Sequence, residues 1–391
     1  MPTNKITVQS GTIGIADSPF YSNETALTSI TFPDGLLYIG EQACKGCTNL
    51  TSAVVPNSVM RIGRFAFNGC SKLASINIPT SLTVIEEYSF GNCSKLTSIS
   101  IPEGVLEIQA SAFFGCPLSS IIIPSSVTTI GKNALWNTVS SSIYFLGDLP
   151  DIQDGISHGA SGIWVPLRYM NNYKTSFGTT SLYPMLESGT KRYRTFSFHN
   201  TLGFDMNGTV KGLYDQSKTL AIKYVSAASL SNHTVTLSTA WGNWQVNEGF
   251  LIVGEGEPGE YYPIQRSTGT LSSHTNLLKG SGANGIDFDP LVAAQGSNLR
   301  YFILSDGDFY PVSGGTLAPY KSYLDLGENI SSSAAFTFIF DDDEPTGVQG
   351  VTVRETTTAD DSYYDLSGRK VSSNALRKGI YIHNGRKEVI K

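Results

Sequence analysis

The chain has 391 residues, of which 40% are hydrophobic and 11% aromatic, a size and composition that predict two or three domains with buried cores. Charged residues make up only 15%, and the formal net charge of −6 leaves no basic surface of the kind that nucleic-acid-binding proteins carry. No apolar run approaches the ~20 residues that a membrane-spanning helix needs. We therefore predict neither nucleic-acid binding nor a membrane span.

The N-terminal stretch MPTNKITVQSGT contains no hydrophobic leader. A chain with this start either stays inside the cell or has lost a signal peptide. The C-terminal segment, considered below, favours the second interpretation. We therefore expect an extracellular or outer-surface protein whose signal peptide has been removed.

A repeat of 23 residues fills the first half of the chain. Four cysteines mark it, at Cys47, Cys70, Cys93 and Cys116. Apolar stretches that end at a proline recur with the same spacing, as in LTSAVVP from Leu50 and LASINIP from Leu73. Two aliphatic columns follow each proline, the first at Leu36, Val59, Leu82, Val105 and Val127, and the second at Ile39, Ile62, Ile85, Ile108 and Ile130.

These columns predict a solenoid. A unit of this length is too short to bury its own apolar side, so stacked units must share one continuous core. The Leu-x-x-Ile-x-Ile pattern turns alternate residues inward, as a half-buried strand requires, and the proline ends each strand. We predict a mainly β fold in which residues 1–188, caps included, form a solenoid with a parallel β-sheet face.

The cysteine column has three possible interpretations. Free cysteine behaves as a small hydrophobe, so we favour an interior ladder. A disulfide between adjacent rungs is possible by distance but has poor geometry, and a single column does not give the tetrahedral arrangement of a metal site. Cys44 and Cys47 match the redox spacing Cys-x-x-Cys, yet Cys44 stands where Phe67 stands one unit later, which indicates a core substitution.

These units resemble the bacterial BspA-type leucine-rich repeats, in which Leu-x-x-Ile-x-Ile-Pro is followed by Ile-Gly-x-x-Ala-Phe-x-x-Cys. The resemblance covers about Ile13 to Pro184 and is most specific from Leu27 to Leu135. The stretches SIYFLGDLP and GIWVPLRYMNNYK resemble the closing strands and short helix that cap such arrays. The resemblance implies a surface protein that binds host matrix proteins or other bacteria.

The outward residues of the predicted sheet give a candidate binding face that is rich in hydroxyls and nearly uncharged. Such a face suits a protein or glycan ligand that is bound by shape. Each predicted strand has two adjacent outward residues, such as Thr28 and Ser29, and one of the two could turn partly inward. The second of each pair is always a serine, and this serine column could form a buried polar ladder: Ser29, Ser52, Ser75, Ser98 and Ser120. The candidate face consists of Thr28, Thr31, Thr51, Val54, Asn77, Thr97, Ser100 and Ile122.

Residues 189–343 predict an antiparallel, β-sandwich-like domain, because short alternating runs are separated by Gly, Ser and Asn. The pair Asp306-Gly307 between two β runs indicates a hairpin. Trp241 and Trp244 flank a Gly-Asn pair, and paired aromatics in a loop either stack on sugars or plug one end of a sandwich. The sugar platform gives an alternative function, a carbohydrate-binding accessory protein. Several segments here resemble a module that recurs in secreted proteins of Bacteroidetes.

Residues 344–391 predict a linker followed by a β-hairpin tail. The tail YYDLSGRKVSSNALRKGIYIHNGRKEVIK places Asn384-Gly385 as a turn between two β runs. It resembles the C-terminal segment of exported Bacteroidetes proteins, which implies secretion or surface sorting.

Motifs for catalysis are missing from the sequence. The five histidines have no second histidine or acidic residue at ligand spacing, and neither His-Glu-x-x-His nor Gly-x-Ser-x-Gly occurs. We therefore predict a non-catalytic, monomeric binding protein, an adhesin, that uses no cofactor or metal.

Overall fold

The computed structural model divides the chain into two compact units, Met1–Tyr183 and Pro184–Lys391. The residues that it describes are 5–20, 26–136, 142–153, 162–177, 182–189, 193–197, 204–207, 209–229, 234–244, 248–254, 256–257, 259–264, 276–281, 285–295, 299–305, 308–312, 314–318, 321–330, 337–340, 363–365, 370–371, 379–383 and 386–390.

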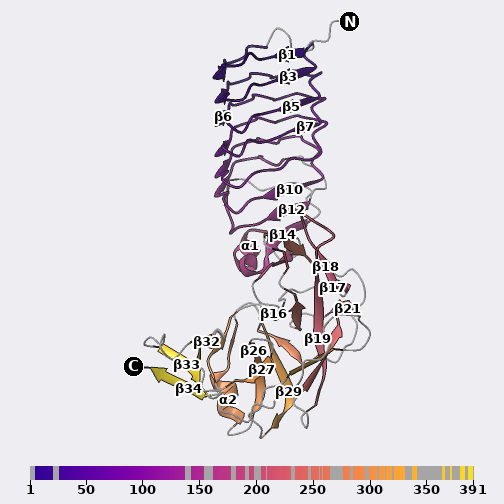
Figure 1. Ribbon diagram of the computed structural model, residues 1–391, viewed down its shortest axis with the longest axis vertical. Coiled ribbons are helices and arrows are strands. Elements are labelled where there is room, and N and C mark those ends of the chain that lie inside the picture. Colours follow the sequence, from indigo (N-terminus) through magenta and orange to yellow (C-terminus); the bar gives the residue numbers. More distant parts are fainter. Residues whose placement is uncertain are drawn as a thin grey trace. The chain divides into compact units, whose positions relative to one another are not determined.

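The first unit is a β-solenoid of about seven coils (Figure 1). Most coils contribute one short strand to each of two parallel rows. The first row contains β1 (Lys5–Thr7), β3 (Ser29–Thr31), β5 (Ser52–Val54) and β7 (Ser75–Ile76), and continues further along with β10 (Ser120–Ile123), β12 (Ser142–Phe145) and β14 (Gly162–Pro166). The second row contains β2 (Gly14–Ile15), β4 (Tyr38–Ile39), β6 (Arg61–Ile62), β8 (Val84–Ile85), β9 (Glu107–Ile108), β11 (Thr129–Ile130) and β13 (Asp151–Ile152).

The predicted shared core is confirmed. Every residue of the two aliphatic columns is buried, and none of these side chains exposes more than 5% of its surface. Phe67, Phe90 and Phe113 form a stack inside the coils, with ring centroids 5.9 and 5.6 Å apart. Neighbouring coils thus bury one another's apolar side, which no coil could do alone.

The interior-ladder interpretation of the cysteines is also confirmed, because all five are free and buried. The thiols of Cys70, Cys93 and Cys116 each donate to a backbone carbonyl of the preceding coil, at Cys44 (3.1 Å), Phe67 (3.3 Å) and Phe90 (3.0 Å). The column therefore fills space and also supplies a donor to a carbonyl in a turn.

The first row differs from expectation in one coil. The stretch from Leu96 to Pro102 was expected to be a strand, but the structure assigns it none. The next coil is one residue shorter between Cys116 and Leu118 and carries Pro117 there. This shorter turn changes the register to the next coil from 23 to 22 residues, and Ser119 N donates to Thr97 O at 3.0 Å.

The C-terminal end of the solenoid is capped as expected. After β14, the chain forms a 3-10 turn (Leu167–Tyr169) and helix α1 (Met170–Phe177). Tyr173 of α1 is fully buried, packs against Phe145 at 5.1 Å between ring centroids, and donates its hydroxyl to the carbonyls of Gly147 and Asp148. The helix thus covers the core that the last coil would otherwise expose.

The second unit consists of antiparallel sheets, as predicted. One contains, in order, β16 (Tyr193–Ser197), β22 (Gly249–Val253), β19 (Thr219–Ser229) and β20 (Thr234–Thr239), with β18 (Thr209–Lys211) also on β19 and β30 (Thr337–Phe340) parallel to β20. The other contains β24 (Leu278–Gly280), β29 (Ser322–Ile330), β26 (Leu299–Ser305) and β27 (Asp308–Pro311). Smaller elements are β15 (Leu182–Glu187) paired with β23 (Tyr261–Pro263), β17 (Phe204–Asn207) with β21 (Trp241–Trp244), β25 (Ile286–Asp287) with β28 (Thr316–Leu317), and helix α2 (Asp289–Gln295).

The two larger sheets of this unit share a core. It joins buried residues of β19, β20 and β22 to buried residues of β24, β26, β27 and β29, namely Val225, Val235, Leu237, Leu251, Leu278, Phe302, Phe309 and Leu324. Strands β26 and β27 pair antiparallel on either side of Asp306-Gly307, as the predicted hairpin requires, and the two turn residues themselves lie outside the described residues.

The tail forms a four-stranded sheet of β32 (Lys370–Val371), β31 (Tyr363–Asp365), β33 (Gly379–His383) and β34 (Arg386–Ile390). Strands β33 and β34 pair antiparallel, as the hairpin predicted at Asn384-Gly385 requires, although these two turn residues are not among those described. The predicted linker before this sheet lies outside the described residues. Among the helices that are described, none is long and apolar enough to cross a membrane.

Candidate binding faces of the solenoid

Most of the predicted first-row face is open to solvent. Its exposed members are Thr28, Thr31, Thr51, Val54, Asn77, Thr97 and Ser100. Val54 stands out, because 75% of its surface is exposed although it is aliphatic. Ile122 is only half-buried and begins the more apolar end of the row.

The serine column is not a buried polar ladder, so that expectation was wrong. Ser52, Ser75, Ser98 and Ser120 are exposed and Ser29 is half-buried. The Leu and Ile columns on either side already fill the interior, which keeps both intervening residues outside. Hydroxyls of the adjacent column instead support the backbone, since Thr51 donates to Thr28 O (3.4 Å) and Ser119 to Thr97 O (3.3 Å).

Asn77 has a structural task on this face. Its amide oxygen accepts from the Val55 backbone nitrogen at 2.8 Å, and its amide nitrogen donates to the Val55 carbonyl at 2.7 Å. The side chain thereby extends the β5–β7 ladder by one rung, which limits what it can offer to a ligand.

Aromatic rings close the first row at its C-terminal end. Trp164 stacks between Tyr144, at 4.9 Å, and Tyr183, at 4.6 Å between centroids. Position 162 must be glycine for this arrangement, because a Cβ there would lie 2.6 Å from the Trp164 ring. Since the rings cover one another's faces and Trp164 is 5% exposed, they serve the end of the sheet rather than offering a flat stacking surface.

The second row carries a feature that sequence reasoning missed. Large apolar side chains are exposed at equivalent positions of successive coils, with Ile13 at 63%, Leu37 at 43%, Met60 at 65% and Leu106 at 49%, and Thr83 stands in the fourth coil. We call these five residues the apolar row. The backbone nitrogens of Leu37, Met60 and Leu106 donate to the carbonyls of Ile13, Leu37 and Thr83, each at 2.8 Å. Ile13, Leu37 and Met60 therefore lie on adjacent rungs, and so do Thr83 and Leu106.

A tyrosine widens the apolar row. Tyr38 is 44% exposed, and its ring lies across Gly14 of the preceding coil, where a Cβ would be 1.9 Å from the ring. Doublets such as Leu36-Leu37 and Val59-Met60 were the available signal, since neighbouring residues of a strand cannot both face inward.

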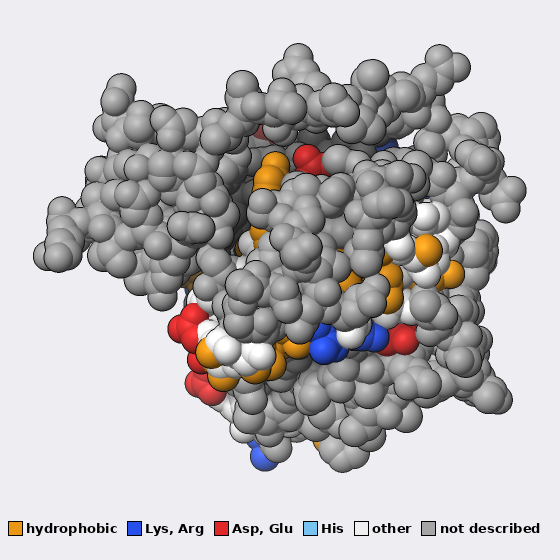
Figure 2. Space-filling view, turned by 90° about the horizontal axis from the view of Figure 1, so that it is seen from below, with side chains coloured by type: hydrophobic (Ala, Val, Ile, Leu, Met, Phe, Trp, Pro, Cys, Tyr) orange, Lys and Arg blue, Asp and Glu red, His pale blue; other side chains and the backbone are white. Residues whose placement is uncertain are grey.

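Charged side chains beside the apolar row form ion pairs between coils. Arg61 binds both carboxylate oxygens of Glu86, at 2.6 and 3.2 Å, and Arg64 pairs with Glu87. The hydrogen bond and charge of Glu86, reinforced by Asp17 and Glu41, raise the pKa of Arg61. Figure 2 is a view from below the orientation of Figure 1 and does not display this row; on the face that it draws, apolar, acidic and basic side chains are mixed.

Trp241 and Trp244 lie in strand β21 rather than in a loop, paired with Asn207 and Phe204 of β17. Their side chains lie outside the described residues. The glycan platform therefore stays a prediction.

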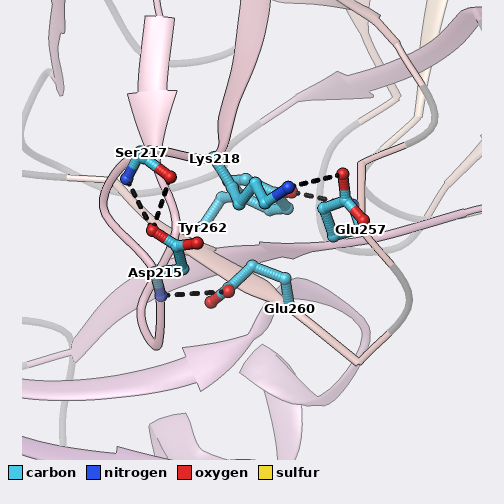
Figure 3. A network of polar contacts seen from close by, with 6 residues as sticks. All are labelled: Asp215, Ser217, Lys218, Glu257, Glu260 and Tyr262. Carbon is cyan, nitrogen blue, oxygen red and sulfur yellow. Dashed lines mark hydrogen bonds and ion pairs between the residues drawn. The ribbon is translucent and has the colours of Figure 1, made fainter.

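A polar network in the second unit joins two loops (Figure 3). Glu260 is 7% exposed, and its carboxylate accepts from the backbone nitrogens of Tyr214 (2.6 Å) and Asp215 (3.1 Å). Lys218 pairs with Glu257 at 3.1 Å, and hydrogen bonds from Ser217 lower the pKa of Asp215. Each carboxylate is thus committed to a neighbouring group, which fits a loop clamp better than acid–base chemistry. Within the described part of the chain, no group of three or more His, Cys, Asp or Glu could hold a metal ion.

Comparison with known families agrees with the coil geometry. Residues 13–142 match, in six copies, the profile described as "BspA type Leucine rich repeat region". No curated protein matches the chain.

Similar solved structures include a leucine rich cell surface protein from Faecalibacterium prausnitzii A2-165, with 28% identity, 36% of this chain and 47% of that chain covered, and a TM-score of 0.31. A leucine-rich repeat protein from Bacteroides ovatus ATCC 8483 has 29% identity, coverages of 41% and 45%, and a TM-score of 0.33. The leucine rich repeat protein of T. pallidum has 25% identity, coverages of 36% and 72%, and a TM-score of 0.30. The match spans less than half of the first two chains, and no conclusion about ligands follows from TM-scores this low.

Proposed function

We propose that this protein is a non-catalytic adhesin at the cell surface or outside the cell, and that the first-row face of its solenoid binds a protein or glycan ligand. The observation that carries the proposal is the surface itself. The eight candidate residues of the first row, from Thr28 to Ile122, include no charged side chain, and all of them except Ile122 are exposed. Stacked coils hold such side chains at fixed spacing, so a ligand meets a surface that needs little reorganisation on binding.

Exposed Val54 is the natural centre of this face, because burying one aliphatic side chain contributes about 1.5–3 kcal/mol. The neighbouring hydroxyls can exchange hydrogen bonds with either a peptide or a sugar. The match to BspA-type repeats supports a binding role, and the resemblance of the tail to segments of exported proteins supports a location outside the cell.

The test uses the full chain on arrays of purified matrix proteins and of glycans. We expect retention on at least one ligand, and at least tenfold weaker binding by the double variant Val54→Lys, Ser100→Lys, because two ammonium groups would have to be desolvated at the interface. Met60→Ser, on the second row, is the matched control and should bind as the unchanged protein does. Absence of any binding, or equal binding by the double variant, would reject the proposal.

A further inference from the structure

The apolar row is a second surface that the proposed function does not use. In the described residues, seven large apolar side chains are prominently exposed, and five of these belong to the row or adjoin it. Soluble proteins rarely leave such side chains in one contiguous patch unless a partner covers it. Ile13, Leu37 and Met60 are on three consecutive rungs, roughly 4.8 Å apart.

The surroundings of the row are strongly acidic. We count the side chains from three residues before to four residues after each row position, over the five coils. Seven carboxylates and two guanidinium groups fall there, a net charge of −5 where the whole chain has −6: Asp17, Asp34, Glu41, Glu86, Glu87, Glu103 and Glu107, with Arg61 and Arg64. Both arginines already pair with carboxylates of this set.

This charge decides between possible occupants. A second copy of the chain would bring another acidic rim against the first, and like charges facing each other disfavour that contact. The negative surface of a membrane is excluded by the same repulsion. A partner that carries lysine or arginine beside its apolar side chains would be attracted instead.

The spacing of the row favours a helix over a strand as the partner's conformation. A helix presents one side-chain position per turn on a given face, every 5.4 Å. Four coil steps of roughly 4.8 Å accumulate a mismatch of only about 2 Å, whereas alternate residues of a strand recur every ~6.6 Å. The row also lies on the face of a sheet, where no backbone groups are left to pair with an added strand.

We propose that the apolar row, Ile13 to Leu106, binds a basic amphipathic helix of a partner protein. Leucine-like side chains of the helix contact Leu37, Met60 and Leu106, and its lysines or arginines lie against the acidic rim. This surface is separate from the first-row face, so either proposal can fail while the other holds.

The experiment measures binding of the full chain to synthetic, fluorescein-labelled 18-residue peptides by fluorescence anisotropy. One peptide has leucines at i, i+4, i+7 and i+11 and lysines elsewhere on the polar face. A second has glutamate in place of lysine, and a third has the first composition in scrambled order. We expect the lysine peptide to bind at least tenfold more tightly than the other two, and more weakly in 0.5 M NaCl.

The matched variants are Met60→Ser and Val54→Ser, which each remove an exposed apolar side chain, one from each row. We expect Met60→Ser to weaken binding of the lysine peptide at least fivefold and Val54→Ser to change it less than twofold, with unchanged circular dichroism for both. Equal effects of the two variants, or equal binding of the scrambled peptide, would overturn the proposal. A dimer in sedimentation velocity that Met60→Ser dissociates would also overturn it, in favour of a second copy.

Discussion

The cysteine of each coil illustrates how one side chain can serve the solenoid in two ways. Cys70, Cys93 and Cys116 are fully buried, as a small hydrophobe in a stacked core should be. Each also donates its weak S–H to a carbonyl of the preceding coil at 3.0–3.3 Å. Because buried backbone carbonyls need partners, the thiol contributes more than its volume.

The buried thiols predict a loss of stability at alkaline pH. Burial is the main cause that raises the pKa of Cys70, and the pKa values of Cys44 and Cys93 are raised by thiol–thiol hydrogen bonds together with burial. Above the ordinary thiol pKa of about 8.5, the unfolded chain loses protons that the native state keeps, so its stability falls as pH rises. We expect the unfolding free energy of the first unit to be level below this pH. Above this pH, the unfolding free energy should fall with a slope that approaches about 1.4 kcal/mol per pH unit for each of these three thiols.

Urea unfolding at several pH values from 7 to 10 measures this slope. Cys70→Ala should lose stability at pH 7 but show a shallower decline above pH 9, because one titrating group is gone. The comparison isolates the thiol from Tyr173, whose pKa is also raised by burial but whose ordinary value lies higher. Identical slopes for the two proteins would contradict the account.

At the scale of elements, the two ladders are interrupted at different coils, the first row between β7 and β10 and the second row between β6 and β8. The stretch Leu96–Pro102 has no strand, and just before it the Asn77 side chain supplies two hydrogen bonds to Val55 that a backbone rung would otherwise provide. The coils on either side are joined mainly by their core and by the second row, where β8 pairs with β9.

Replacing Asn77 with alanine should therefore destabilise the solenoid by about 1–3 kcal/mol, the net value of two hydrogen bonds to buried or half-buried backbone groups. Ser100→Ala, one coil further along the same column, is the control and should change stability by less than about 0.5 kcal/mol. Both unfolding free energies come from urea titration. A loss at Asn77 no larger than at Ser100 would show that the amide does not support the ladder.

The sequence predicts the repeat and the inward columns, because burial imposes a period that can be read directly. It predicts both hairpins from their Asp-Gly and Asn-Gly pairs, and the cap from its resemblance to the closing segments of similar arrays. It cannot show that Asn77 turns its amide onto Val55, since the same column holds threonine, valine, serine and isoleucine in other coils. It also predicts a strand over Leu96–Pro102 that the structure does not have, because the sequence LTSISIP has the same residue pattern as the stretches that do form strands. The apolar row was readable in the Leu36-Leu37 and Val59-Met60 doublets, but only one residue of each doublet can enter the core.

At the scale of the whole molecule, one solenoid presents two chemically different surfaces. The first row is uncharged and rich in hydroxyls, whereas the second is apolar with an acidic rim. Both arise from the same 23-residue period, since every outward position of a coil repeats along the axis and accumulates whatever side chain it carries. Two ligands of different chemistry could therefore bind the same coils without competing.

The two compact units have cores made of different residues, which predicts two separate unfolding transitions. Phe90 is buried in the stacked rings of the solenoid, and Phe302 is buried in the core between the two larger sheets of the second unit. Replacing either with alanine should cost about 3–5 kcal/mol, because it leaves a large cavity. In differential scanning calorimetry of the full chain, we expect Phe90→Ala to lower the midpoint of one transition and Phe302→Ala that of the other. A single transition that both variants lower equally would mean that the units unfold together.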